Sequence, residues 1–179
     1  PPSARKPGLG RGFISRSLLD ARSTNDAITR ATEMGQAGGH NIQLFDFCKR
    51  SILNIEVAQG LFALRPIGAS PFFHANQYQT LTVPGQTFGN SSVHRLARVS
   101  ELPVPRTLEE VLSILGDQGD RQYPIFHDRI SHARGELSDW TLATVTFDLD
   151  ARRATILQGN PKADSRRLSW DVSALMAAG

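Results

Sequence analysis

An alternation of apolar and polar residues near the end of the chain places the strongest constraint on its fold. Val145, Phe147 and Leu149 stand two residues apart within residues 140–150, which is the period of a strand with one buried face. The short segment ARR follows, and residues 154–159 form a second apolar run. This pattern predicts an antiparallel hairpin.

Helical and strand-like runs alternate in groups along the rest of the chain. Helices are predicted at residues 12–21, after a capping box at residues 23–26, at residues 91–102, and after a second capping box that begins at Thr107. Strands are predicted at the four remaining apolar runs, residues 41–47, 52–57, 61–67 and 70–76, and residues 123–127 are expected to be extended. Groups of helices and groups of strands favour an α+β fold over a parallel βαβ sheet.

Composition excludes several classes of function. The chain has 179 residues, enough for one domain, and no apolar run reaches the roughly 18 residues of a membrane span. The net charge is +3 and the basic residues are scattered in short pairs, so we expect a soluble protein that does not bind nucleic acid. Cys48 is the single cysteine, which excludes an internal disulfide and a cysteine-based zinc site. His40 and His74 lack a carboxylate at ligand spacing, so no metal is expected.

Polar residues interrupt the strand-like runs at a few positions. Gly39, before His40 and Asn41, either ends a helix in a turn or lets backbone approach a ligand closely. His74 and Asn76 would share one face of a strand. An asparagine amide there either satisfies loop backbone or donates to a developing oxyanion, and both interpretations remain open.

Two further polar positions have alternative interpretations. Glu56 lies in an apolar strand and either binds backbone amides or orients a polar site. His127, Asp128 and Arg129 follow the apolar segment YPIF, and they form either a polar strand end or one wall of an active site. No serine or threonine stands in a recognisable nucleophile motif.

The segments PGLGRGFISRSLLDARSTNDAI, GGHNIQLFD, LNIEV, FFHANQ, YPIF and WTLATVTFDLDARRATILQGNP occur in an order that resembles one known family. This is the isopenicillin-N acyltransferase-like (acyl-CoA:6-aminopenicillanic acid acyltransferase) family of cysteine N-terminal-nucleophile hydrolases. The resemblance covers roughly residues 7 to 161 and implies a four-layer αββα sandwich. It also implies autoproteolytic processing that exposes an N-terminal cysteine, whose thiol forms an acyl-enzyme from an amide or thioester. It implies no cofactor.

The resemblance further implies that this chain is the later part of such a protein. Residues 1–11 are expected to be a flexible lead-in or a processed end. Residues 12–179 would form the C-terminal part of a single αββα domain, completed by a companion chain that carries the nucleophile. A non-catalytic binding or assembly module that kept the fold without the nucleophile is the alternative.

Site residues follow from the resemblance position by position. Asn76 matches the family's oxyanion-hole asparagine, although its neighbours are Ala75 and Gln77 where the family has threonine and histidine. His127 stands where the family usually has arginine, and Arg129 is two residues further on, so either could supply a positive wall. The substrate pocket is expected to include the remaining members of the site, His40, Asn41, Phe72, Phe73, Phe126 and Thr144.

Overall fold

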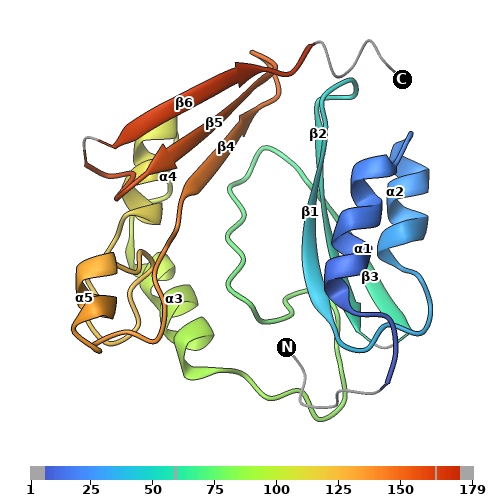
Figure 1. Cartoon of the computed structure of the whole chain (residues 1–179), viewed down its shortest axis with the longest axis horizontal. Helices are drawn as coiled ribbons and strands as arrows, with labels where there is room; N and C mark the ends of the chain where they lie inside the picture. The colour runs from blue at the N-terminus through green and yellow to red at the C-terminus, as the bar shows by residue number, and fades with distance from the viewer. Residues whose placement is uncertain (1–6, 59, 164, 174–179) are drawn as a thin grey trace. The chain divides into compact units, whose positions relative to one another are not determined.

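The computed structural model describes residues 7–58, 60–163 and 165–173. The chain divides into two compact units, residues 1–89 and residues 90–178, and each is described by itself. Each unit combines helices with a three-stranded antiparallel sheet (Figure 1). The protein is therefore a mixed fold that is compatible with the predicted α+β class.

The first unit begins with two short helical segments. Helix α1 spans Arg11–Ser17 and continues as the 3-10 turn η1, Leu18–Asp20, while α2 spans Thr24–Ala31. The hydroxyl of Ser23 accepts a hydrogen bond from the backbone N–H of Asp26 at 3.1 Å, which caps α2 as predicted. Residues 1–6 of the predicted lead-in lie outside the described residues.

Three strands follow in a simple antiparallel order. They are β1 (His40–Asp46), β2 (Ser51–Ala58) and β3 (Leu61–Ile67), with β2 in the centre. The register pairs Asn41 with Glu56 and Glu56 with Ala63. These strands confirm the predictions made from the apolar runs in the sequence.

The two faces of this sheet differ in chemistry because side chains alternate along β2. Ile55 and Val57 are fully buried with Ala31 of α2, and this apolar face packs against the helices (Figure 1). Asn54 and Glu56 point to the opposite face and are also fully buried. The chain after β3 runs over that polar face.

The prediction of a strand at residues 70–76 is wrong, because this segment is a loop. Its backbone turns at Asn76, whose φ of 36° lies in the left-handed region. A few residues later, backbone N–H groups bind the side chain of Glu56 rather than a neighbouring strand. The apolar residues of the segment therefore resemble a strand in sequence but lack a partner ladder.

The helices of the second unit are α3 (Asn90–Glu101), α4 (Leu108–Leu115) and the short α5 (Arg129–Ala133). Both hydrogen bonds of the predicted capping box are present. The backbone N–H of Glu110 donates to the Thr107 hydroxyl at 3.2 Å, and the backbone N–H of Thr107 donates to the Glu110 carboxylate at 3.1 Å. Helix α5 was not predicted. The extended segment predicted at residues 123–127 is also wrong, since these residues form bends before α5.

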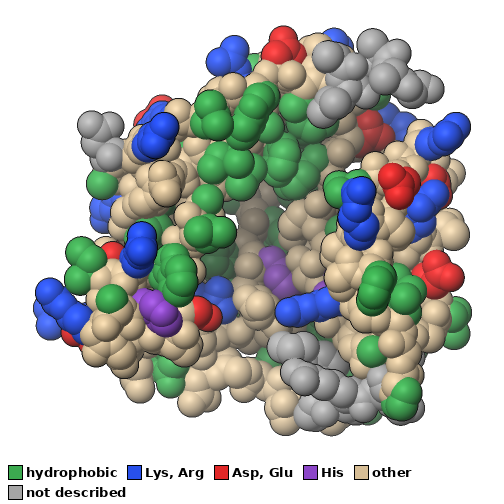
Figure 2. All heavy atoms as spheres, viewed as in Figure 1, with side chains coloured by type: hydrophobic (Ala, Val, Ile, Leu, Met, Phe, Trp, Pro, Cys, Tyr) green, Lys and Arg blue, Asp and Glu red, His purple; other side chains and the backbone are tan. Residues whose placement is uncertain are grey.

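The sheet of the second unit contains β4 (Thr144–Asp148), β5 (Arg153–Gln158) and β6 (Arg166–Asp171). The hairpin of β4 and β5 confirms the alternating pattern, whereas β6 was not predicted. Cross-strand partners place apolar side chains on one face, and hydrophobic side chains gather over this sheet in Figure 2. The exposed members of this face are Val145, Phe147, Leu168 and Trp170.

Among the described residues, every helix is too short or too polar to cross a bilayer.

Candidate active-site pocket

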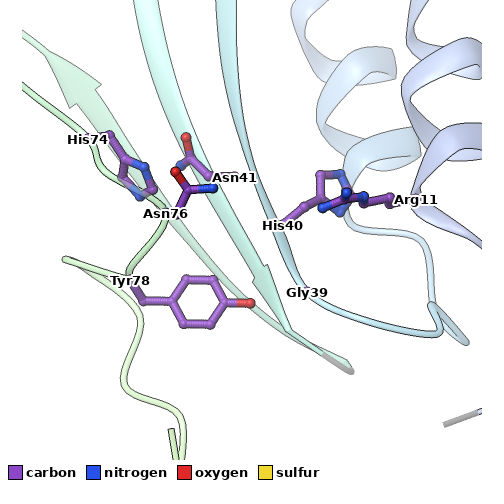
Figure 3. A pocket seen from close by; sticks show the side chains of 7 residues that line it. All are labelled: Arg11, Gly39, His40, Asn41, His74, Asn76 and Tyr78. Carbon is purple, nitrogen blue, oxygen red and sulfur yellow. The ribbon is translucent and has the colours of Figure 1, made fainter. Parts of the chain in front are cut away.

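A polar pocket of about 260 Å³ lies around the beginning of β1 in the first unit (Figure 3). Its wall combines residues from α1, from the start of β1 and from the loop after β3. His40 points toward the helices, whereas Asn41, the next residue, points toward the loop (Figure 3). The lining residues are Arg11, Gly39, His40, Asn41, His74, Asn76 and Tyr78.

Tyr78 anchors the loop against the sheet on one side of this pocket. Its hydroxyl donates a hydrogen bond to the carbonyl oxygen of Val57 at 2.6 Å. Burial, together with the nearby Glu56 carboxylate, raises the pKa of Tyr78 to about 12. The hydroxyl therefore stays protonated at neutral pH and keeps its donor.

Gly39 allows this close approach of Tyr78. A Cβ at Gly39 would overlap the Tyr78 hydroxyl and lie 2.5 Å from the carbonyl oxygen of Val57. The sequence left open whether this glycine ends a helix or admits a ligand. The close approach is instead to another part of the same chain.

Replacing Gly39 with alanine is expected to destabilise the protein by about 1–3 kcal/mol, because the Tyr78 ring must leave its place. Gly38→Ala is the matched control, since a Cβ there meets no atom within 4 Å. Urea denaturation of the two variants and the wild type measures the difference. Equal stabilities for the two variants would show that Tyr78 moves at no cost.

Glu56 holds the loop that carries the polar residues of the pocket. The side chain is fully buried, and its two oxygens accept hydrogen bonds from the backbone N–H groups of Gln79, Thr80 and Leu81 at 2.7, 2.8 and 2.7 Å. A buried carboxylate requires such partners. Of the two interpretations open from the sequence, Glu56 therefore binds backbone amides, and it does so beside the pocket.

His74 completes the set of Glu56 partners. Its Nε2 lies 3.1 Å from Glu56 Oε1, and because a carboxylate oxygen only accepts, Nε2 carries the proton. Burial lowers the pKa of His74, and the hydrogen bond to Glu56 opposes this shift without cancelling it. The imidazole is therefore neutral at pH 7 and acts as a support for the loop.

Asn76 lies between His74 and Tyr78 on the rim of the pocket. It is the central residue of a tight turn in which the N–H of Gln77 donates to the carbonyl oxygen of Ala75, and Ala75 itself is fully buried. A positive φ in a residue other than glycine is uncommon and marks a constrained position. The side chain itself is exposed and faces the pocket (Figure 3).

His40 and Asn41 were predicted as pocket residues, and both line it. Asn41 Nδ2 donates to the carbonyl oxygen of Ile55 at 3.3 Å, and its Oδ1 accepts from Gln43 at 3.2 Å. Both ring nitrogens of His40 are buried without a hydrogen-bond partner among the described residues. Asn41 is thus fixed by the sheet, whereas His40 keeps unused hydrogen-bonding capacity.

Phe72 and Phe73 are half-buried and do not line this pocket. The Phe72 ring instead lies under the Arg65 guanidinium, 4.4 Å from ring centroid to Cζ, and 6.2 Å from the ring of His74. Their role as an acyl-binding wall remains a prediction.

The four other predicted site residues belong to the second unit. Phe126 is buried and its N–H donates to the carbonyl oxygen of Asp117 at 3.0 Å. His127 Nδ1 contacts the Asp139 carboxylate. Arg129 is exposed at the start of α5, and Thr144 is half-buried at the start of β4. Their part in substrate binding, including the choice between His127 and Arg129, remains a prediction.

Sequence reasoning missed two pocket residues, Arg11 and Tyr78. Arg11 fell in the segment expected to be a lead-in, and nothing in its neighbourhood indicates a site. Tyr78 fell in a predicted loop, where a tyrosine can serve many purposes. The pairing of Gly39 with Tyr78 joins residues far apart in sequence, so no local pattern could reveal it.

Cys48 lies outside the pocket. It is exposed in the turn between β1 and β2, at the opposite end of β1 from His40. Within the described ranges, no group of three or more histidine, cysteine or acidic side chains is placed to hold a metal ion.

Comparison with known proteins identifies the family of the chain. No significant match was found among curated proteins. The model of one family, described as acyl-coenzyme A:6-aminopenicillanic acid acyl-transferase, matches residues 2–163. This match covers nearly all of the first compact unit, the second unit as far as residue 163, and every predicted site residue. The chain therefore belongs to the acyl-coenzyme A:6-aminopenicillanic acid acyl-transferase family.

Proposed function

We propose that this chain forms part of a cysteine N-terminal-nucleophile amidohydrolase or acyltransferase. Family membership points to an enzyme of acyl transfer or hydrolysis. The proposal adds that the attacking thiol comes from a companion chain produced by autoproteolysis, and that the present chain supplies the pocket in which the acyl carbonyl is activated.

The proposed reaction has two steps. The thiolate sulfur attacks the carbonyl carbon, a C–S bond forms, and the C–N bond of an amide or the C–S bond of a thioester breaks while the leaving amine or thiol takes a proton. Water or an amine then attacks the acyl-enzyme, releases the thiol and receives the acyl group. Negative charge develops on the carbonyl oxygen in both steps.

The position of Asn76 is the observation that carries this proposal. An amide N–H₂ carried by a constrained backbone turn at the rim of a polar pocket suits a developing oxyanion, because the turn presents the side chain to the pocket before charge appears. The His74–Glu56 bond holds the loop before Asn76, and the Tyr78–Val57 bond and the three Glu56–backbone bonds hold it after Asn76. His74 is then a structural neighbour of the donor.

Cys48 is unsuited to the attack. It lies beyond the far end of β1, a strand of seven residues, which separates it from His40 by about 20 Å at the usual rise per residue. Within the described residues, no strand pairs with the outer edge of β1. A strand of the companion chain that added to this edge parallel to β1 would bring its own first residue near the pocket.

The finer fold proposed here is the four-layer αββα sandwich of such hydrolases. The β4–β6 sheet supports it, because Phe147 and Trp170 on its apolar face remain 42% and 44% exposed. A face of this kind needs a covering layer in a complete domain. The sandwich would supply it.

Intact-mass analysis and N-terminal sequencing of the purified protein test the proposal. We expect a second species that begins with cysteine, and alkylation of that cysteine should abolish turnover of amide substrates. Cys48→Ser should retain the wild-type rate, because Cys48 is remote from the pocket. A stably folded single species of 19.6 kDa that forms no acyl adduct would instead favour the non-catalytic binding module.

A further inference from the structure

His74 has one ring nitrogen that its support of the loop does not use. Nε2 donates its proton to Glu56 Oε1 at 3.1 Å, so the neutral ring carries a lone pair on Nδ1. Within the described ranges Nδ1 has no hydrogen-bond partner, and unlike the ring nitrogens of His40 it is not completely shielded. The side chain is 9% exposed and lines the pocket. His74 therefore presents an unprotonated nitrogen at this site.

The same pocket contains the proposed oxyanion donor. His74 and Asn76 stand two residues apart on one loop, and both line the pocket (Figure 3). A carbonyl whose oxygen lies at the Asn76 amide would have its carbon in the space that His74 borders. The pocket, of about 260 Å³, has room there for a water molecule or a small amine as well.

The buried Glu56 carboxylate suits His74 to accept a proton. Burial lowers the pKa of His74, so the ring is unprotonated at pH 7 and its lone pair is available. The hydrogen bond to Glu56 acts in the opposite direction, because the carboxylate stabilises the imidazolium. Glu56 also fixes which nitrogen carries the proton. A histidine held in this way by a carboxylate is the usual form of a general base.

We propose that His74 is the general base of deacylation, and that it takes a proton from the water or amine that attacks the acyl-enzyme. This inference rests on the proposed function, because it requires an acyl-enzyme. The oxygen of water, or the nitrogen of the amine, bonds to the acyl carbon while its proton passes to His74 Nδ1. The C–S bond then breaks, and the departing sulfur takes a proton from the imidazolium. This restores both the thiol and the neutral ring.

Pre-steady-state kinetics of the whole protein, with any chain it is processed with, separate the two steps. The activated ester p-nitrophenyl acetate gives a burst of p-nitrophenolate as the acyl-enzyme forms and a linear phase as it is hydrolysed. His74→Gln is the informative variant, because the glutamine amide can still donate to Glu56 whereas the base at Nδ1 is gone. We expect the burst to persist and the linear rate to fall by roughly 10²–10⁴-fold.

A second histidine–carboxylate pair supplies the matched control. His94 Nδ1 lies 2.8 Å from Asp120 Oδ2, and His94 does not line the pocket. His94→Gln should keep both kinetic phases. An intact burst with an unchanged linear rate in His74→Gln would overturn the inference and leave the proposed function standing. Equal loss of both phases in folded His74→Gln would also overturn it, since His74 would then serve only to hold the loop. A wild type without a burst would remove the proposed function and the base with it.

The protonation of the ring is measurable without turnover and without a variant. In protein labelled with ¹⁵N-histidine, the NMR signals of the two ring nitrogens show which of them carries the proton. We expect His74 to be neutral at pH 7, with its proton on Nε2 and none on Nδ1. A proton on Nδ1 in place of Nε2, or on both nitrogens, would overturn the inference whether or not the protein forms an acyl-enzyme.

Discussion

Replacing Asn76 with alanine is expected to lower the turnover of amide substrates by roughly 10²–10³-fold, the usual effect of removing one oxyanion donor. The KM should change much less, because the interaction strengthens only as charge develops on the carbonyl oxygen. Steady-state kinetics on the processed protein measure both quantities. The fold should persist, since the Asn76 side chain is exposed.

The left-handed backbone at Asn76 calls for a second variant. Alanine is strained at a φ of 36°, so part of any loss in Asn76→Ala could come from the turn itself. Asn76→Gly adopts this conformation without strain and also lacks the amide. Both variants should lose turnover alike. A near-wild-type rate in Asn76→Gly would mean that the residue shapes the loop and donates nothing to the reaction.

Local sequence patterns predict most of the regular structure. Two kinds of local signal were sufficient: the apolar runs that form β1, β2 and β3, and the helix caps Ser23 and Thr107. Each depends only on residues a few positions apart in the sequence. Propensity and side-chain alternation therefore suffice to find them. Strand β6 was missed because its sequence, RRLSWD, begins with two arginines and all its residues are exposed.

The loop after β3 shows where local patterns fail. Phe72 and Phe73 resemble a strand in sequence, yet the conformation of this loop follows from a carboxylate that lies about 20 residues earlier in the chain, Glu56. The backbone N–H groups it binds have no sequence signature. A lone acidic residue in an apolar strand indicates a buried partner but does not say which one.

The pocket residues also fall into two groups, those that the sequence predicted and those that only the structure reveals. Asn76, His40 and Asn41 were predicted from an ordered resemblance and line one pocket, whereas Arg11 and Tyr78 became visible only in three dimensions. Arg11 reaches the pocket because α1 packs near the start of β1, a tertiary arrangement that its own sequence neighbourhood does not encode.

Replacing Glu56 has the largest expected effect on stability. Glu56→Ala removes the acceptor of three backbone N–H groups and of His74 Nε2. All four of these hydrogen bonds are partly buried. Buried donors left without acceptors cost about 1–3 kcal/mol each, partly relieved where water enters. We expect a loss of at least about 3 kcal/mol in the free energy of unfolding, measured by urea denaturation.

Glu56→Gln distinguishes the role of the charge from that of the shape. Glutamine fills the same space but keeps one acceptor oxygen and turns an N–H₂ group toward backbone donors, so it should destabilise nearly as much as alanine. Glu33→Gln is the matched control, because Glu33 is exposed in the same unit and its side chain makes no hydrogen bond among the described residues. That control should stay within about 0.5 kcal/mol of the wild type.

The effect of Glu56→Gln on turnover links stability to function. Glu56 holds the chain on both sides of Asn76, through His74 before it and the N–H groups of Gln79 to Leu81 after it. A loosened turn places the donor amide less accurately, and small displacements of catalytic groups lower rates strongly. Folded Glu56→Gln should therefore turn over more slowly than Glu33→Gln at equal folded concentration. A wild-type rate combined with the expected loss of stability would show that the Asn76 turn keeps its shape without this carboxylate.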